Sequence, residues 1–148
     1  MYDQFRMKNE QVNSPQINMN DPNSNQPEPV RVFLADGRLR TRTALRLLLE
    51  QQPEFRVVGE AAEIGNLLAQ TAAVCPHLLL LDWELRGFRA DLLPVLRKQQ
   101  PHLKVVAMST RPEIRLLALD AGVDAFVCKV DPPEHLLVCL AQVRQTIR

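Results

Sequence analysis

The chain has 148 residues, of which 46% are hydrophobic and 24% charged, and its formal net charge at pH 7 is +1. This length and composition are typical of one globular domain that is large enough to bury a core. A net charge so close to zero argues against a partner that binds through bulk electrostatics, such as nucleic acid or a membrane surface.

The cysteines and the apolar runs narrow the class of protein further. The chain has three cysteines, Cys75, Cys128 and Cys139, and no two of them have CxxC spacing. We therefore expect reduced thiols in the core rather than a disulfide framework or a zinc site. The first 30 residues contain no apolar stretch, so we expect no signal peptide, and every apolar run is far too short for a membrane span. These features favour a cytoplasmic protein without a membrane anchor.

The composition changes sharply near residue 30. Residues 1–29 are rich in Asn, Gln, Ser and Pro and have almost no aliphatic side chains. Such a segment cannot bury enough apolar surface to offset the entropy lost on ordering. We therefore predict a disordered polar tail over 1–29 and a folded domain over 30–148.

From Val30 onward, strand-like and helix-like segments alternate. The strand-like runs are short, apolar and partly β-branched, and they cover residues 30–36, 53–61, 76–82, 101–109 and 124–129. The helical segments carry apolar residues at helical spacing, and they cover residues 40–52, 63–75, 89–100, 112–122 and 131–147. Strands that alternate with helices predict right-handed crossovers and a parallel sheet with helices on both faces. The run Leu78–Leu81 fits a central strand of such a sheet, where no polar face is needed.

Prolines and caps support these boundaries. Pro53, Pro76 and Pro101 each follow a helical segment and precede a strand, which is a position typical of proline. Gly122 is predicted to end the fourth helix. For the last helix we predict Asp131 as N-cap.

In that last helix Pro132 would take the first helical position. Glu134 would then complete a capping box with Asp131, because the two residues have D-x-x-E spacing.

Four polar residues end four of the predicted strands: Asp36, Asp82, Ser109 and Lys129. Each alone has an ordinary structural explanation, such as a helix cap, a turn residue or a solvated strand end. Together they are informative, because ligands of open parallel sheets bind beyond the carboxyl ends of the strands. Carboxylates suit Mg²⁺, and a hydroxyl and an ammonium suit phosphoryl oxygens. The pattern predicts phosphoryl transfer to an aspartate.

The stretches "VRVFLADGRLR", "HLLLLDWELRG", "VVAMST" and "GVDAFVCK" occur in this order over roughly residues 30–148. Together they resemble the receiver domain of bacterial two-component response regulators. The resemblance implies a flavodoxin-like (βα)5 fold, with five parallel strands in the order 2-1-3-4-5 and helices on both faces. It also implies a sensor histidine kinase or a phosphotransfer protein as the phosphoryl donor.

The family pattern assigns a role to each matching residue. Asp82 would be the phosphoacceptor, and Ser109 and Lys129 would contact the phosphoryl group. Asp36 and Asp82 would bind Mg²⁺ together with the backbone carbonyl of Glu84. Phe126 would be the aromatic switch residue.

The sequence departs from the family pattern at the metal site. The family usually has two adjacent acids after the first strand, whereas this chain has Asp36 followed by Gly37. We therefore expect Mg²⁺ binding to be weakened rather than lost, since Mg²⁺ keeps most of its waters. Glu84 could turn its side chain inward as a substitute, although a solvated loop glutamate is the commoner arrangement. Arg86 and Arg111 could add positive charge near the site.

Two kinds of function remain open at this stage. The main prediction is a switch in which phosphorylation of Asp82 reshapes the face made by residues 112–122, 124–129 and 131–147, the face through which the family is expected to form homodimers. The alternative is a pseudo-receiver, a phosphorylation-independent interaction module. The residues Asp82, Ser109 and Lys129 favour the switch, whereas Gly37 and Arg86 favour the pseudo-receiver. Flavin binding is a weaker third reading, because no phosphate-cradling loop follows the first strand.

Overall fold

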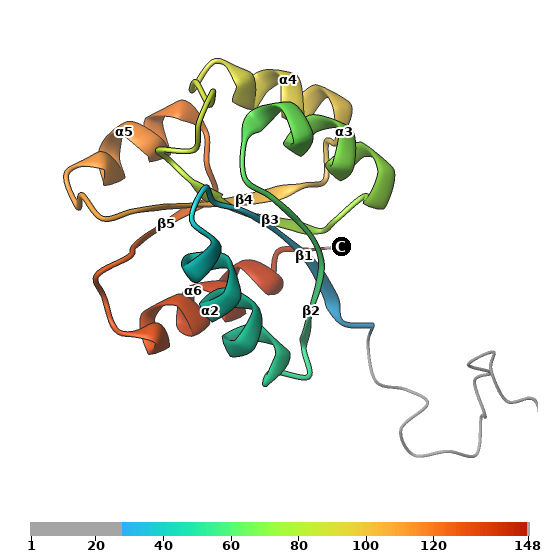
Figure 1. Cartoon of the computed structure of the whole chain (residues 1–148), viewed down its shortest axis with the longest axis vertical. Coiled ribbons are helices and arrows are strands. Elements are labelled where there is room, and N and C mark those ends of the chain that lie inside the picture. The colour runs from blue at the N-terminus through green and yellow to red at the C-terminus, as the bar shows by residue number, and fades with distance from the viewer. Residues whose placement is uncertain (1–27, 148) are drawn as a thin grey trace, which may run out of the picture.

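The computed structural model describes residues 28–147. Its core is a sheet of five parallel strands in the order β2-β1-β3-β4-β5 (Figure 1). The strands are β1 (Val30–Ala35), β2 (Phe55–Ala61), β3 (Leu78–Asp82), β4 (Lys104–Ser109) and β5 (Ala125–Cys128). The helices are α2 (Leu39–Glu50), α3 (Ile64–Val74), α4 (Leu92–Gln99), α5 (Ile114–Ala121) and α6 (Pro133–Arg144).

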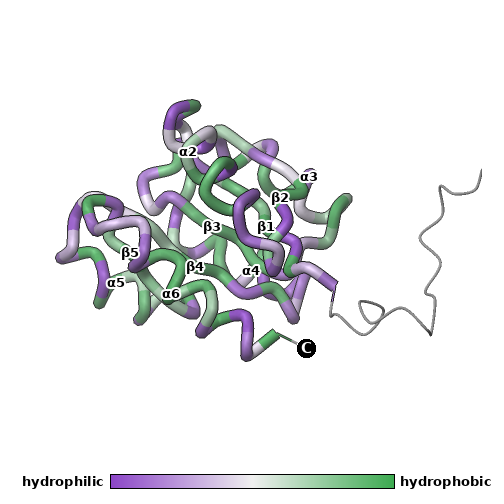
Figure 2. Tube along the Cα trace, turned by 90° about the horizontal axis from the view of Figure 1, so that it is seen from below, coloured by the Kyte–Doolittle hydropathy of each residue, from purple (hydrophilic) through white to green (hydrophobic). Residues whose placement is uncertain are grey.

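The central strand β3 is buried along its whole length, which explains its unbroken leucines. Residues Leu78–Leu81 have no exposed surface, and Leu80 pairs with Leu34 of β1 on one side and with Val106 of β4 on the other. A parallel strand covered on both faces has no need for polar side chains. In Figure 2 the central strands are accordingly coloured as hydrophobic along much of their length.

Helices cover the two faces of the sheet in groups of two and three. Helices α2 and α6 lie on one face, and α3, α4 and α5 lie on the other (Figure 1). Each face has its own cluster of buried side chains. Leu49 and Leu140 pack in the cluster under α2 and α6, and Leu67, Leu93 and Ala118 pack in the cluster under α3, α4 and α5. The predicted parallel sheet, its strand order and its two covered faces are confirmed.

The predicted capping box of the last helix is wrong. Helix α6 begins at Pro133, one residue later than predicted, and no side chain caps its first turn. The reason is the pair of prolines, because a residue that precedes a proline is held extended, as Pro132 is with ψ 149°. Asp131 then lies too far from the first helical amides. Its carboxylate is instead 3.4 Å from Nδ1 of His135.

The cysteines form no disulfide, as predicted, but their predicted place in the core is only partly right. Cys128 and Cys139 are half-buried, whereas Cys75 is exposed. Cys75 follows α3 in a left-handed conformation with φ 47°, just before Pro76. The chain leaves the helix at this point, so the side chain lies outside the core.

Two further predictions concern membrane-spanning segments and the N-terminal tail. Every helix within residues 28–147 is too short or too polar to cross a membrane. Most of the predicted tail, residues 1–27, lies outside the described residues.

A close contact between β1 and β2 provides a test of the fold. The register of these strands shifts between Val32 and Phe33, which brings Gly59 against the ring of the fully buried Phe33. A Cβ atom at Gly59 would lie 2.6 Å from Cε2 of that ring. We expect Gly59→Ala to lower the free energy of unfolding by about 1–3 kcal/mol, the usual penalty for overpacking a core. Urea unfolding followed by Trp83 fluorescence would measure it.

Gly65→Ala is the matched control for this substitution. A Cβ atom at Gly65 would meet only Glu63 Oε1, at an ordinary 3.7 Å, and alanine favours the helix that contains it. The control should therefore be neutral or slightly stabilising. Equal losses in the two variants would contradict the contact between Gly59 and Phe33.

Candidate functional site

The four polar residues predicted at strand ends come together at one edge of the sheet. Asp36 and Lys129 directly follow β1 and β5, and Asp82 and Ser109 are the last residues of β3 and β4. A cavity of about 520 Å³ lies over this edge, with Asp82 and Lys129 in its lining. We call it the Asp82 pocket.

Lys129 bridges the two aspartates. Its Nζ donates a hydrogen bond to Asp36 Oδ2 at 2.6 Å and lies 3.4 Å from Asp82 Oδ1. Asp36 is completely buried, and its Oδ1 accepts a hydrogen bond from the backbone amide of Arg38 at 2.9 Å. Both oxygens of this buried carboxylate therefore have partners, as a buried charge requires.

Asp82 lies at the base of the pocket in a partly desolvated position. Burial raises the pKa of its carboxyl group, and the neighbouring charge of Asp36 adds to this effect. A hydrogen bond from the Glu84 amide, at 3.0 Å, and the charge of Lys129 act in the opposite direction, but the pKa stays above its usual range. The carboxylate is thus more basic than an exposed aspartate.

A second layer of residues supports Asp36 from behind, and sequence reasoning missed it. Arg42 of α2 donates from Nη1 to the backbone carbonyl of Asp36 at 2.7 Å and from Nε to Glu60 of β2 at 2.9 Å. Burial alone would raise the pKa of Glu60, but the hydrogen bonds and charges of Arg46 and Arg42 outweigh it and lower that pKa. The only sequence signal was the arginine face of the helix, which is usually just solvated.

The Glu84 side chain turns inward, but it does not join the aspartates. Ser109 Oγ lies 3.1 Å and 3.2 Å from the two carboxylate oxygens of Glu84, to which it donates, and Arg111 Nη2 lies 3.2 Å from one of them. The backbone amide of Arg111 donates in turn to Ser109 Oγ at 3.1 Å. The hydroxyl expected to contact a phosphoryl group is therefore bound to a carboxylate of the same chain.

The loop that carries Glu84 is fixed at both ends. Asp82 Oδ1 accepts from the Glu84 amide, and the carbonyl of Arg86 accepts from the amide of Ile64 at 3.1 Å, at the start of α3. Gly87 follows with φ 82°, and a Cβ atom there would lie 2.5 Å from Cγ2 of Ile64. A glycine is therefore required where this loop passes α3.

Basic side chains outnumber acidic ones around the Asp82 pocket. Its four basic residues, here called the basic lining, are Arg38, Arg86, Arg111 and Lys129. Its three acidic residues are Glu63, Asp82 and Glu84. Arg86 and Arg111, which the sequence offered as sources of positive charge near the site, both line the pocket.

These donors fit a divalent metal poorly as they are arranged. The carboxylate of Asp36 is occupied by Lys129 and the Arg38 amide, and that of Glu84 faces Ser109. Within residues 28–147, no group of three or more His, Cys, Asp or Glu side chains is placed to hold a metal ion. Of the three residues predicted to bind the metal, Asp82 lines the cavity and these contacts leave its Oδ2 unused, whereas Mg²⁺ usually needs one or two such groups.

Phe126, the predicted switch residue, lies away from the pocket. It is in β5, is 7% exposed and packs in the cluster under α3, α4 and α5. The role predicted for it is not tested by this position alone.

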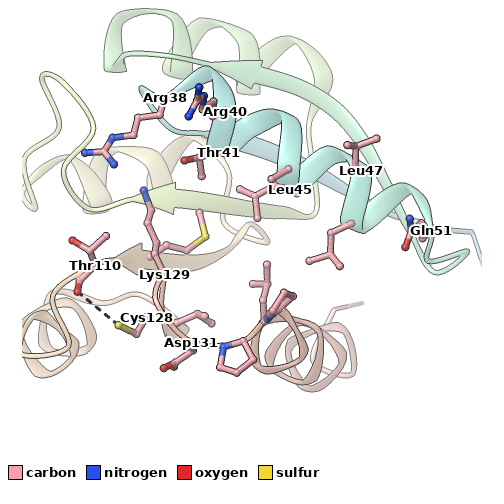
Figure 3. A pocket seen from close by; sticks show the side chains of 17 residues that line it. Arg38, Arg40, Thr41, Leu45, Leu47, Gln51, Thr110, Cys128, Lys129 and Asp131 are labelled. Atoms are coloured by element: carbon pink, nitrogen blue, oxygen red, sulfur yellow. Dashed lines mark hydrogen bonds between the residues drawn. The ribbon is translucent and has the colours of Figure 1, made fainter.

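A second, larger hollow of about 730 Å³ lies between α2 and the start of α6. Its lining is mainly apolar, with Leu45 and Leu48 on one side and Pro133 and Leu136 on the other. Figure 3 shows Lys129, one of its lining residues, extending from the end of β5 toward the start of α2 at one side of this hollow. Asp82 does not line it, so the chemistry of the strand ends belongs to the smaller pocket.

Comparisons with known proteins agree with this architecture. The family model described as "Response regulator receiver domain" matches residues 32–141. The nitrate/nitrite response regulator protein NarL of Escherichia coli strain K12 is 32% identical over 122 residues, which are 80% of this chain and 56% of that protein. The DNA-binding transcriptional activator DevR/DosR of Mycobacterium tuberculosis is 34% identical over 103 residues, which are 68% of this chain and 48% of that protein. The chain thus spans about half the length of these curated relatives.

A solved structure of a receiver domain has the same fold as this chain. The signal receiver domain of the putative response regulator NarL from Mycobacterium tuberculosis superposes with a TM-score of 0.73 at 25% identity, covering 80% of this chain and 98% of that one. Since the family match covers most of the folded residues, and the strand order and the ends of the strands agree with it, the chain belongs to the family of response regulator receiver domains of two-component systems.

Proposed function

We propose that Asp82 is the residue of this receiver domain that accepts a phosphoryl group, with a sensor histidine kinase or a phosphotransfer protein as donor. The observation that carries the proposal is the position of its carboxylate at the base of the Asp82 pocket, 3.4 Å from the Lys129 ammonium. The end of a rigid, buried strand holds this nucleophile in a fixed place, which lowers the entropy that must be lost in the reaction.

The transfer is a displacement at phosphorus. Asp82 Oδ1 is engaged by the Glu84 amide and faces Lys129, so we assign the attack to Oδ2. A new P–O bond forms as the P–N bond of the donor phosphohistidine breaks. The electron pair of that bond stays on the ring nitrogen, and the imidazole leaves as neutral histidine because its other nitrogen carries a proton. Lys129 would stabilise charge on the phosphoryl oxygens.

In the phosphorylated state, Ser109 is proposed to contact the phosphoryl group, and Phe126 to follow it. This movement would reshape the face made by α5, β5 and α6. Leu116 and Val138 of this face are 72% and 58% exposed, which is compatible with a homodimer formed through it. Phe126 has no hydroxyl, so packing alone would transmit the change.

Receiver domains generally bind Mg²⁺ in the acidic pocket. For this chain we propose only weak binding, to Asp82, the Glu84 carbonyl and, through water, Asp36. Gly37 removes one acid, and Lys129 occupies the carboxylate of Asp36.

The wider assignments follow from the same proposal. The domain would act in the cytoplasm and would catalyse nothing beyond its own phosphorylation and dephosphorylation. The protein-glutamate methylesterase of Rhodopseudomonas palustris is 30% identical to this chain, but the match covers only 35% of that protein. The similarity therefore gives no reason to assign esterase activity to this chain. We likewise propose that residues 30–148 bind neither nucleic acid nor a membrane directly.

Phosphorylation of Asp82 can be measured directly. The protein is incubated with acetyl phosphate and Mg²⁺, and its intact mass is recorded beside that of Asp82→Ala. We expect the gain of one phosphoryl group in the native chain and none in the variant, since the nucleophile is gone. Folding of both proteins is checked by circular dichroism. A folded native chain that gains no phosphoryl group under these conditions would support the pseudo-receiver alternative instead.

The raised pKa of Asp82 predicts a pH-dependent effect on stability. The folded chain holds this proton more tightly than the unfolded chain, so stability is highest below the usual pKa of aspartate and is lost as the pH rises through the raised pKa of the folded state. Asp82→Asn removes the charge, and we expect its Tm at pH 7 to exceed that of the native chain by about 2–4 °C, the shift that about 1 kcal/mol gives in a domain of this size. The difference should shrink as the pH falls toward the usual range of aspartate.

Asp91→Asn is the control for this measurement, because Asp91 is exposed and pairs with the exposed Arg89. It should show no such gain at pH 7. A gain in Asp82→Asn that stayed constant down to acid pH would show that titration of this carboxyl group is not its cause.

A further inference from the structure

We propose that the Asp82 pocket binds a phosphate-sized dianion without a divalent metal, with the basic lining in the role of the metal, and that the Glu84 carboxylate is the internal anion that the dianion displaces. This inference rests on the proposed function, because it concerns the same site and the same phosphoryl group. It adds that the basic lining neutralises the phosphoryl group and that the Glu84 side chain must move to admit it.

The first argument is that the pocket already holds an anion. The Glu84 carboxylate is bound by the hydroxyl of Ser109 at 3.1 Å and by the guanidinium of Arg111 at 3.2 Å. Ser109 has no exposed surface and its Oγ already accepts from the Arg111 amide, so without Glu84 the hydroxyl proton would lack an acceptor. The site therefore stabilises negative charge above Asp82 with protein groups alone.

The second argument is the charge that remains when Glu84 leaves. The four residues of the basic lining would then face Asp82 and Glu63 in the pocket, and Asp36 pairs with Lys129, so one positive charge would remain in excess. A bound anion offsets that surplus. Arginine is well suited to this task, because its planar group offers paired donors to phosphate oxygens and is always charged.

The third argument concerns the metal ligands. In the structure, Lys129 is bound to Asp36 at 2.6 Å, which puts an ammonium against the carboxylate that would otherwise help to bind a cation. Gly37 offers no side chain as a replacement. A divalent cation in this pocket would have to compete with Lys129 and with nearby arginines, whereas an anion gains from both.

Space is available for the exchange. The pocket has a volume of about 520 Å³, and the Glu84 side chain is 42% exposed, so it can rotate toward solvent without unpacking the core. The loop itself need not move, because its ends are fixed by the Glu84 amide and the Arg86 carbonyl.

The test uses beryllofluoride, the phosphomimetic with which RcsB of Salmonella enterica was solved. It is a monoanion, and its adduct with the Asp82 carboxylate carries the two negative charges of a phosphoaspartate. Binding is followed by fluorescence of Trp83, the neighbour of Asp82, in buffer freed of divalent metals by a chelating resin and again with excess Mg²⁺. We expect the two apparent dissociation constants to agree within about threefold, a difference below about 1 kcal/mol. Binding that occurs only with Mg²⁺, or under neither condition, would overturn the proposal.

Charge variants separate the proposal from an unspecific effect. Arg111→Gln should weaken metal-free binding about tenfold, and Glu84→Gln should strengthen it about tenfold, since about 1.4 kcal/mol is typical of one charged hydrogen bond. Arg115 is exposed on α5, outside the pocket, and Arg115→Gln removes one positive charge just as Arg111→Gln does. It should leave the affinity unchanged. Equal effects of Arg111→Gln and Arg115→Gln would contradict a role for the basic lining.

Gly37→Asp provides the reverse experiment. A Cβ atom at Gly37 would lie at an ordinary 3.6 Å from the carbonyl oxygen of Ala62, so the backbone position accepts a side chain. We expect metal-free binding to fall and binding with Mg²⁺ to rise, because the variant exchanges cationic surplus for a metal ligand. A variant that stayed independent of Mg²⁺ and kept its metal-free affinity would count against the proposed charge balance.

The outcomes for the two proposals can be told apart. Transfer from acetyl phosphate to Asp82, together with beryllofluoride binding that occurs only with Mg²⁺, would overturn the metal-free site and leave the proposed function intact. Metal-free binding of beryllofluoride without any gain in mass from acetyl phosphate would support the site and count against the proposed function.

Discussion

The ion pair between Lys129 and Asp36 is the contact on which the arrangement of the site depends. It joins the ends of β5 and β1, between which the sheet places β3 and β4, so the lysine side chain passes over the end of β3. Asp36 has no exposed surface, and removing its partner would leave a buried charge at a cost of several kcal/mol. Because Asp36 holds the ammonium there, Asp82 has a positive neighbour at 3.4 Å.

The charge balance around that lysine differs from that of an acidic pocket. Where three acids crowd together, a divalent metal relieves their repulsion. In this chain Gly37 leaves one acid out, and the arginines at positions 38, 86 and 111 add positive charge. The structure balances this surplus internally by turning Glu84 onto Ser109 and Arg111. One missing carboxylate thus changes which sign of charge the pocket attracts.

Much of the fold could be predicted from the sequence, because each signal there is local. The leucines of β3 show a buried strand, prolines show the ends of helices, and the polar residues at the strand ends show one edge of the sheet. The wrong predictions concern positions where an adjacent proline changes the course of the backbone. The capping box of Asp131 failed because two prolines in succession moved the start of α6, and Cys75 was placed in the core although the chain turns outward there.

The least predictable part of the site was the direction of long side chains. The sequence placed Glu84 two residues after Asp82, but its rotamer depends on Ser109 and Arg111, which come from β4 and the loop after it. Likewise, Arg42 and Glu60 support Asp36 through contacts between α2 and β2 that no local pattern shows. Contacts of this kind depend on tertiary distances, which spacing along the chain does not determine.

The two anchors of the loop after β3 also have a kinetic consequence. The Glu84 amide is bound to Asp82, and the Arg86 carbonyl is bound to Ile64, so the backbone between them is restrained. Departure of the Glu84 carboxylate from Ser109 then needs only rotations about side-chain bonds, which in an exposed residue take picoseconds to nanoseconds. Opening of the pocket would be much faster than any domain motion, and the rate of anion entry would be set by diffusion and by the field of the arginines rather than by a slow conformational gate.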